Sequence, residues 1–166
     1  MDHSEQERRP AGGRDPFERA VELAYRSISR RDRTVAEVRA FLERKHVEPE
    51  PIEHALGELT EAGWLDDERF AQRFAEDKRT IERWGSERIE RELRRRGVPD
   101  DAIAAAAGEQ DRDHELAAAV HILADKSRPL EDDRERDRAW RLLVRKGYEP
   151  ELAYEAVREF GRRTAA

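Results

Sequence analysis

Apolar residues recur along this chain at helical spacing, and one pattern of them occurs three times. In the segment 87–103, ERIERELRRRGVPDDAI, the apolar positions are Ile89, Leu93, Val98 and Ile103. The same positions are occupied 51 residues earlier and 50 residues later by two further sets: Val38, Leu42, Val47 and Ile52, and Ala139, Leu143, Tyr148 and Ala153. A fixed period of this size is typical of stacked-repeat proteins, in which each unit packs on its neighbours and the array binds partners through its surface.

Each copy of the pattern contains three segments of helical periodicity, which predicts an all-α fold of about nine helices in three tandem three-helix repeats. We expect an elongated, curved helical-repeat protein. The predicted divisions are a disordered N-terminal tail, repeats 1, 2 and 3, and a C-terminal tail, at residues 1–16, 17–63, 64–109, 110–161 and 162–166. The N-terminal tail is polar and rich in glycine and proline, a composition that does not form a packed core.

Polar residues at the segment ends predict how the helices are capped. Thr34 and Glu37 have the spacing of a capping box, and Ser86 is placed to cap the middle helix of repeat 2. Gly97 ends that helix, as a left-handed glycine commonly does. His46 occupies the corresponding position in repeat 1, where we expect a looser cap or a different geometry because histidine adopts the left-handed conformation less easily.

The composition supports this organisation and limits the cellular setting. Hydrophobic residues make up 37% of the chain and charged residues 43%, which suits units that each bury one face better than one large central core. The absence of cysteine excludes disulfides and thiolate metal sites, and it favours a reducing, cytoplasmic location. No apolar run approaches the ~20 residues of a membrane span, and the N-terminus lacks the apolar segment of a signal peptide.

The net charge of −6 conceals a pattern that follows the repeat. The segments 26–45 and 78–96 each have a net charge of +4, whereas 47–68 has −8, so the middle helices are basic and the third helices acidic. Ion pairs between residues four apart, together with matching to helix dipoles, could explain this without any function. Alternatively, a basic stripe crosses several units and binds phosphates or an acidic protein surface, for which arginine is well suited.

Residues that would indicate catalysis, a cofactor or a metal are lacking, and we therefore expect a protein that is not an enzyme. His114 and His121 share a helix face, but a metal site there would need further ligands. Among the tryptophans, Trp64 and Trp140 lie where we expect them to pack in the core. Trp84 lies in a helix break and is equally compatible with packing and with an exposed contact.

The central block AGWLDDERFAQRFAEDKR, followed by WGSERIERELRRRGVP, resembles the RecX family of recombinase regulators. Members of that family share a glycine–aromatic–leucine–aspartate–aspartate block, then Arg-Phe-Ala, and later a helix that ends at a basic residue and glycine. The resemblance covers about residues 20–160. Its most specific positions, which we take as a structural motif, are Gly63, Trp64, Leu65, Asp66, Asp67, Phe70 and Gly97.

The resemblance implies a regulatory protein that binds RecA and lodges in the groove of the RecA–DNA filament. Nothing in the sequence indicates an obligate dimer, so we expect a monomer. Such proteins modulate, and mostly inhibit, the recombinase, coprotease and ATPase activities of RecA, and therefore act in DNA repair and the SOS response. They have no cofactor, metal or catalytic residue of their own. Combined with the basic stripe, this implies contacts to RecA or to the DNA backbone from Arg31, Arg33, Arg39, Arg88, Arg91 and Arg95.

Two alternatives remain open from the sequence. The chain could be a DNA-binding helical module that acts without RecA, in which case it would bind DNA alone with a steep dependence on salt. It could also be a helical scaffold for some other protein. Binding to RecA with and without DNA distinguishes these possibilities.

Overall fold

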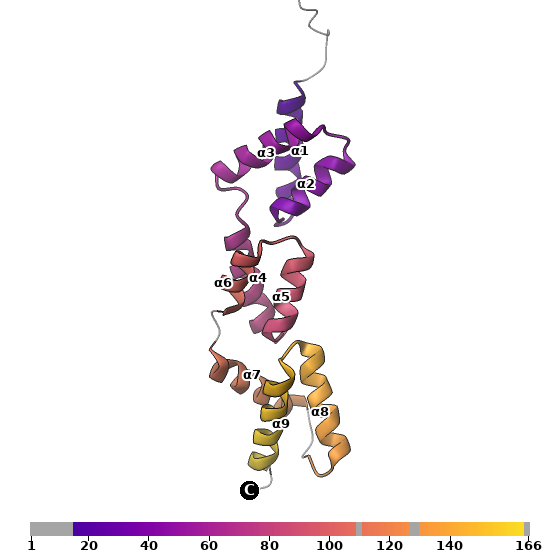
Figure 1. Ribbon diagram of the computed structural model, residues 1–166, viewed down its shortest axis with the longest axis vertical. Coiled ribbons are helices and arrows are strands. Elements are labelled where there is room, and N and C mark those ends of the chain that lie inside the picture. Colours follow the sequence, from indigo (N-terminus) through magenta and orange to yellow (C-terminus); the bar gives the residue numbers. More distant parts are fainter. Residues whose placement is uncertain (1–14, 109–110, 127–129, 165–166) are drawn as a thin grey trace, which may run out of the picture. The chain divides into compact units, whose positions relative to one another are not determined.

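All regular structure is helical in the computed structural model, which describes residues 15–108, 111–126 and 130–164 (Figure 1). The all-α prediction is confirmed, with three helices in each repeat. Within the described residues the helices are α1 (Pro16–Ile28), α2 (Val35–Arg44), α3 (Pro49–Glu61), α4 (Asp67–Thr80), α5 (Ser86–Arg95), α6 (Asp100–Gly108), α7 (Arg112–Lys126), α8 (Asp133–Lys146) and α9 (Pro150–Thr164). Helix α9 continues to Thr164, three residues past the end that the sequence predicts for repeat 3.

The chain divides into two compact units. Unit 1 consists of Met1–Arg33 and Val38–Leu65, and unit 2 consists of Thr34–Glu37 and Asp66–Ala166. Repeat 1 therefore belongs to unit 1, except for the start of α2, and repeats 2 and 3 together form unit 2. The predicted N-terminal tail lies outside the described residues, apart from its last two. One of these, Asp15, accepts a hydrogen bond from the amide of Phe17 at 3.1 Å and caps α1.

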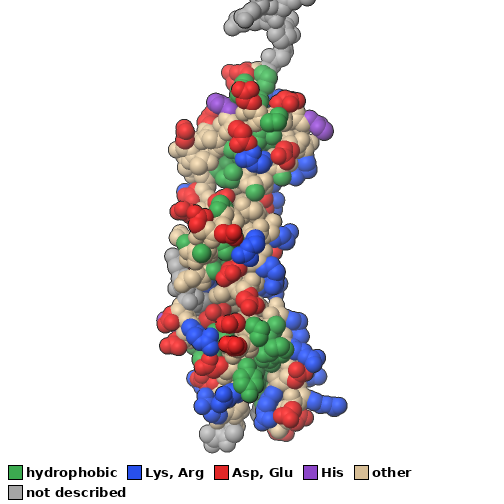
Figure 2. Space-filling model, viewed as in Figure 1, with side chains coloured by type: hydrophobic (Ala, Val, Ile, Leu, Met, Phe, Trp, Pro, Cys, Tyr) green, Lys and Arg blue, Asp and Glu red, His purple; other side chains and the backbone are tan. Residues whose placement is uncertain are grey.

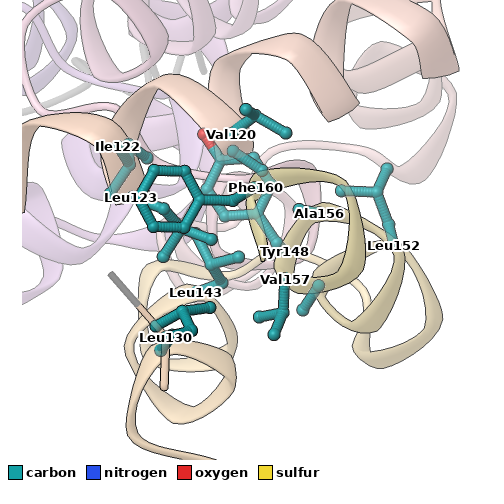
Figure 3. Packing of buried hydrophobic residues seen from close by; sticks show 13 residues of the cluster. Val120, Ile122, Leu123, Leu130, Leu143, Tyr148, Leu152, Ala156, Val157 and Phe160 are labelled. Carbon is teal, nitrogen blue, oxygen red and sulfur yellow. The ribbon is translucent and has the colours of Figure 1, made fainter. Parts of the chain in front are cut away.

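The recurrent apolar positions form the core of each repeat. Eleven of the twelve are buried, and only Val47 is partly exposed. In every repeat the first and third helices pack against one another, α1 on α3, α4 on α6 and α7 on α9. Figure 3 shows the core of repeat 3, where side chains from α7, α8 and α9 surround Tyr148 and Phe160. Tyr148 is 2% exposed, and this burial raises the pKa of its hydroxyl to about 12.

The three middle helices end in the same way. In each, a residue with positive φ follows the helix, and the next amide donates a hydrogen bond to a carbonyl five residues earlier, which is a Schellman arrangement. The positive-φ residues are His46 at 56°, Gly97 at 77° and Gly147 at 92°. The expectation of a different geometry at His46 is therefore wrong, because the hydrogen bonds that close the helix outweigh the strain of a left-handed histidine.

The starts of the middle helices differ from one another. Thr34 and Glu37 form the predicted capping box, since each accepts the other's backbone amide at 3.2 Å. In repeat 2 the predicted cap is wrong, because Gly85 is the N-cap residue of α5 and Ser86 is the first helical residue. The amide of Ser86 donates instead to the carboxylate of Glu115 at 2.9 Å. Glu115 lies 29 residues further along the chain, so the residues around Ser86 do not reveal that it accepts this hydrogen bond.

Two joints of the same design occur within unit 2. In the first, the hydroxyl of Thr34 donates to the carbonyl of Arg96 at 2.7 Å, and the amide of Val35 donates to Asp67 at 3.0 Å. The guanidinium of Arg96 binds both carboxylate oxygens of Glu37, each at 2.9 Å. Burial raises the pKa of Asp67, and this outweighs the opposite effect of the hydrogen bond from Val35.

The second joint connects repeat 2 to repeat 3. The amide of Gly85 donates to the carbonyl of Lys146 at 2.9 Å, and the amide of Glu87 donates to the carbonyl of Gly147 at 3.1 Å. Glu115 binds the first amide of α5 just as Asp67 binds that of α2. Both joints therefore have the same two contacts. The start of a middle helix binds the end of the middle helix of the following repeat, and it also binds an acidic residue in the first helix of that repeat. The second joint places α5 beside α8.

Candidate functional site

Helix α5 has four arginines among its ten residues, namely Arg88, Arg91, Arg94 and Arg95. Ile89 and Leu93 are fully buried and anchor one side of it. Arg88, Arg91 and Arg95 lie away from these buried residues, at a spacing that places them on one face of the helix. Arg88 and Arg91 face α8, whereas Arg95 bends back onto Glu92, its Nε donating at 3.0 Å. Two of these three arginines therefore lie on the surface beside α8.

A groove of about 590 Å³ lies between α5 and α8. Four of its seven lining residues are basic and one is acidic, so the groove carries an excess of positive charge. Figure 2 shows Lys and Arg side chains along the edge of the molecule formed by these helices. The lining residues are Trp84, Arg88, Arg91, Glu92, Leu142, Arg145 and Lys146.

The cations of this basic groove are crowded together. The ammonium group of Lys146 donates to the carbonyl of Glu82 at 2.6 Å. Burial lowers the pKa of Lys146, and the nearby charges of Lys126 and Arg88 lower it further, more than Glu82 raises it. Like charges held this close create a positive potential that an anion would relieve. The groove can therefore bind an anionic ligand, although it offers no group for covalent chemistry.

Trp84 forms the aromatic floor at one end of the basic groove. The guanidinium carbon of Arg88 lies 3.9 Å from the centre of its ring system, and the ammonium of Lys78 lies at 4.8 Å. Phe74 packs against it edge-on, with ring centres 6.4 Å apart. Trp84 thus both packs and lines the surface, which combines the two possibilities that the sequence left open. Its stacking fixes the orientation of Arg88 towards α8.

Two arginines in the basic groove are free to bind a partner. Neither Arg91 nor Arg145 has a hydrogen bond or ion pair from its guanidinium to another described residue, and both side chains are exposed. The single acidic lining residue, Glu92, is neutralised by Arg95. The hydrogen bond from Arg95 lowers the pKa of Glu92 below its usual range, and together with the nearby positive charges it outweighs burial, which acts in the opposite direction. An incoming anion would therefore meet cations that have no internal partner.

The candidate arginines of repeat 1 are placed differently. Arg33 donates to the carbonyl of Ser27 at 3.0 Å and lies over the ring of Phe41. Arg39 forms an ion pair with Glu53, and this hydrogen bond raises the pKa of Arg39. Arg31 alone is exposed and forms no hydrogen bond or ion pair with the described residues.

The structural-motif residues mostly build local structure. Gly63 has a φ of 73° and ends α3, Leu65 is buried, and Asp66 caps α4 by accepting the amide of Arg69 at 2.9 Å. Asp67 accepts a hydrogen bond from the first amide of α2, a role that the sequence did not predict. The guanidinium of Arg96 lies over the ring of Phe70, 4.4 Å from the ring centre.

The prediction that Trp64 is a core residue is wrong. It is 62% exposed, and its ring packs edge-on with that of Tyr25, with ring centres 6.1 Å apart. The turn after Gly63 directs it outward while the neighbouring Leu65 fills the core. Trp140 is partly buried, with its indole nitrogen donating to the carbonyl of Pro150 at 3.0 Å.

The second wall of the basic groove was not predicted from the sequence. Leu142, Arg145 and Lys146 lie on α8, more than fifty residues after Arg88 and Arg91. Segment 126–146 has a net charge of +3, which was the available signal, but periodicity does not show which helix of another repeat lies opposite α5. The missed residues are those that the second joint brings into place.

The described part of the chain contains no group of three or more histidine, cysteine, aspartate or glutamate side chains placed to bind a metal. His114 and His121 each lie near one acidic residue, Asp111 and Asp125 respectively. Within residues 15–108, 111–126 and 130–164, no helix has both the length and the apolar composition needed to cross a membrane.

Comparison with known proteins gives consistent results. Residues 20–59 match the first three-helix domain of RecX, and residues 66–106 match its second three-helix domain. The regulatory protein RecX of Amycolatopsis mediterranei is 34% identical over 146 residues, which cover 86% of this chain and 83% of that protein. The regulatory protein RecX of Deinococcus radiodurans is 32% identical over 153 residues, covering 92% of this chain and 73% of the relative.

The fold is also similar to solved structures. The crystal structure of RecX from Lactobacillus salivarius matches with a TM-score of 0.79, covering 88% of this chain and 97% of that one. At 16% sequence identity this similarity supports the fold alone. The helical-repeat architecture is therefore supported independently of the sequence matches.

Proposed function

The chain belongs to the RecX family of regulatory proteins, and from this membership we propose that it binds RecA and RecA–DNA filaments through the basic groove of unit 2. The observation that carries the proposal is the set of four cations that line the groove between α5 and α8, of which Arg91 and Arg145 are exposed and have no partner among the described residues. A RecX-type regulator that acts without chemistry of its own needs such a surface.

The ligand of the basic groove is an acidic surface of RecA, or the DNA backbone that the filament carries. Arginine guanidinium groups bind carboxylate and phosphate oxygens through two parallel hydrogen bonds, so either anion fits. Arg31 supplies an additional contact from repeat 1, because it too is exposed. Arg33, Arg39 and Arg95 contribute less than the sequence suggested, since each is engaged by contacts within the protein.

Binding to a filament multiplies weak contacts. A RecA filament presents the same surface on every subunit, so a repeat protein that contacts neighbouring subunits gains avidity without any single strong contact. Bridging of this kind inhibits by blocking the turnover or growth of the filament, and the nucleotide site remains accessible. The expected outcome is inhibition of the recombinase, coprotease and ATPase activities.

The test is a RecA ATPase assay on single-stranded DNA with two matched double variants. Arg91→Glu/Arg145→Glu reverses the charge of the two groove arginines that have no partner among the described residues. Arg94→Glu/Arg141→Glu makes the same charge change on the same two helices, at positions outside the groove. We expect the first variant to need at least about tenfold more protein for half-inhibition, as expected for a loss of about 1.4 kcal/mol. The second variant should inhibit normally.

Full inhibition by Arg91→Glu/Arg145→Glu would refute the proposed site. Capture experiments with RecA, DNA and a non-hydrolysable nucleotide test the partner itself. Retention only by the filament supports the proposal. Retention by DNA without RecA, with a steep loss of affinity as salt rises, would instead favour the direct DNA-binding module.

A further inference from the structure

The exposed surface between α8 and α9 of repeat 3 has side chains of a different chemical type from the corresponding surface between α2 and α3 of repeat 1. By the period of the repeat, Arg39 and Glu53 correspond to Trp140 and Tyr154. In repeat 1 these positions form an ion pair, as expected for solvated helix faces. In repeat 3 they are both aromatic, and Tyr154 is 60% exposed. Trp140 also packs against the core of repeat 3, but an exposed tyrosine at a position where the fold accepts an ion-pair partner is not required for folding, which points to a binding surface.

The two aromatic residues belong to a groove of about 810 Å³. This volume lies within the range of sites that bind small molecules or short peptide segments. The hydrogen bond from Trp140 to the carbonyl of Pro150 holds the indole in place. Figure 2 shows hydrophobic side chains gathered over α9. The residues of this aromatic groove are Leu130, Asp133, Arg136, Asp137, Trp140, Tyr154, Val157, Arg158, Gly161 and Arg162.

The rim of the aromatic groove has an uncompensated positive charge. Its two acidic residues are already engaged, Asp133 with Arg136 at 2.9 Å and Asp137 with Arg141, outside the groove, at 2.7 Å. The two arginines of α9 that line the groove form no ion pair with the described residues. One of them, Arg158, lies 5.9 Å from the ring centre of Tyr154, and the other is Arg162.

We propose that the aromatic groove binds a short acidic segment of a partner protein, anchored by an aromatic or leucine side chain. The anchor packs between Trp140, Tyr154 and Val157, and the carboxylates of the segment pair with Arg158 and Arg162. Tryptophan, tyrosine and arginine are the residues that most often dominate the energetics of protein interfaces. This site is separate from the basic groove, which lacks an apolar floor of this size, and it does not depend on RecA as the partner.

A phage-displayed library of random 12-residue peptides, selected on the immobilised full chain, tests the proposal. The expected result is enrichment of peptides that combine several aspartates or glutamates with phenylalanine, tryptophan or leucine. A synthetic peptide of the enriched sequence, followed by fluorescence anisotropy, should bind Tyr154→Glu at least about tenfold more weakly. It should also bind Arg162→Glu more weakly, whereas Arg163→Glu, on the next residue and outside the groove, should bind normally.

All three substitutions change exposed helix positions, so the fold should be retained, and far-ultraviolet circular dichroism verifies this. Enrichment of basic or uncharged peptides, or equal binding to Tyr154→Glu, would overturn the proposal. A dimer seen by sedimentation and dissolved by Tyr154→Glu would assign the groove to a second copy of the chain. Binding of a dT12 oligonucleotide that Tyr154→Glu abolishes would assign it to nucleic acid, and either result refutes the acidic segment.

Discussion

A single methyl group added at Gly147 should open the second joint. Gly147 has a φ of 92°, and a β-carbon there would lie 2.2 Å from the β-carbon of Arg88, 2.6 Å from its amide nitrogen and 2.9 Å from its α-carbon. Two of these three atoms belong to the backbone, so no change of rotamer relieves the clash. The left-handed conformation costs an L-residue roughly 1–2 kcal/mol, and overpacking adds about 1–3 kcal/mol. We therefore expect Gly147→Ala to lower the free energy of unfolding by about 2–5 kcal/mol.

Two other glycines separate these contributions. Gly63→Ala has the left-handed strain alone, because φ is 73° and a β-carbon there meets nothing within 4 Å. Gly85→Ala has the clash alone, because its φ is −77° and its β-carbon would lie 2.3 Å from the carbonyl oxygen of Gly147. We expect losses of about 1–2 kcal/mol for the first and about 1–3 kcal/mol for the second.

Urea unfolding followed by circular dichroism gives the stabilities, and hydrogen exchange locates the damage. In Gly147→Ala the amides of Gly85 and Glu87 should exchange faster, because their acceptors are the carbonyls of Lys146 and Gly147. Exchange in α1 and α3 of unit 1 should not change in Gly147→Ala. In Gly63→Ala, exchange should become faster in α1 and α3, while the amides of Gly85 and Glu87 keep their protection. The reasoning is refuted if Gly147→Ala costs no more than Gly63→Ala and leaves the protection of Gly85 and Glu87 intact.

Three further predictions concern side chains of the core and joints. Burial raises the pKa of the Tyr148 hydroxyl to about 12. The stability that the neutral hydroxyl contributes is therefore fully present below pH ~10 and is lost as pH rises through ~12. Urea unfolding at about pH 11.5 should show that the wild type loses up to about 2 kcal/mol of unfolding free energy relative to Tyr148→Phe. Arg96→Lys should cost about 1–2 kcal/mol in the same assay, because lysine cannot bind both carboxylate oxygens of Glu37, whereas an unchanged midpoint would contradict this. His46→Gly should raise the melting temperature, with a gain of up to about 1 kcal/mol from relief of its left-handed backbone.

The helices and the core could be predicted because their signal is local and repeated. A residue such as Leu93 recurs with its apolar neighbours every fifty residues, and three copies of one weak pattern confirm one another. The capping box at Thr34 and the helix end at Gly97 depend on contacts within a few residues. Each of these features is encoded where it occurs.

The candidate site could be predicted only in part, because it depends on contacts between distant segments. Spacing places Arg88, Arg91 and Arg95 on one face, but it does not show that Glu92 engages Arg95 or that Arg145 lies across the groove. The exposure of Trp64 was missed for a related reason. Its sequence neighbours are those of a core residue, while the turn after α3 decides which side chain points inward.

The ends of the middle helices show why glycine is needed at some repeats and not at others. His46 has a left-handed backbone and the same hydrogen bonds as Gly97 and Gly147, so the conformation alone does not require glycine. The distinguishing feature is close approach. A β-carbon at Gly97 would lie 2.4 Å from that of Ala36, and one at Gly147 would meet Arg88, whereas His46 is exposed.

Glycine therefore marks the helix ends that receive the start of another middle helix. A side chain at residue 46 would collide with any helix start that approached α2 in the same way. His46 has the same left-handed backbone but an exposed side chain, so this helix end accepts a β-carbon at the modest cost of one strained backbone conformation.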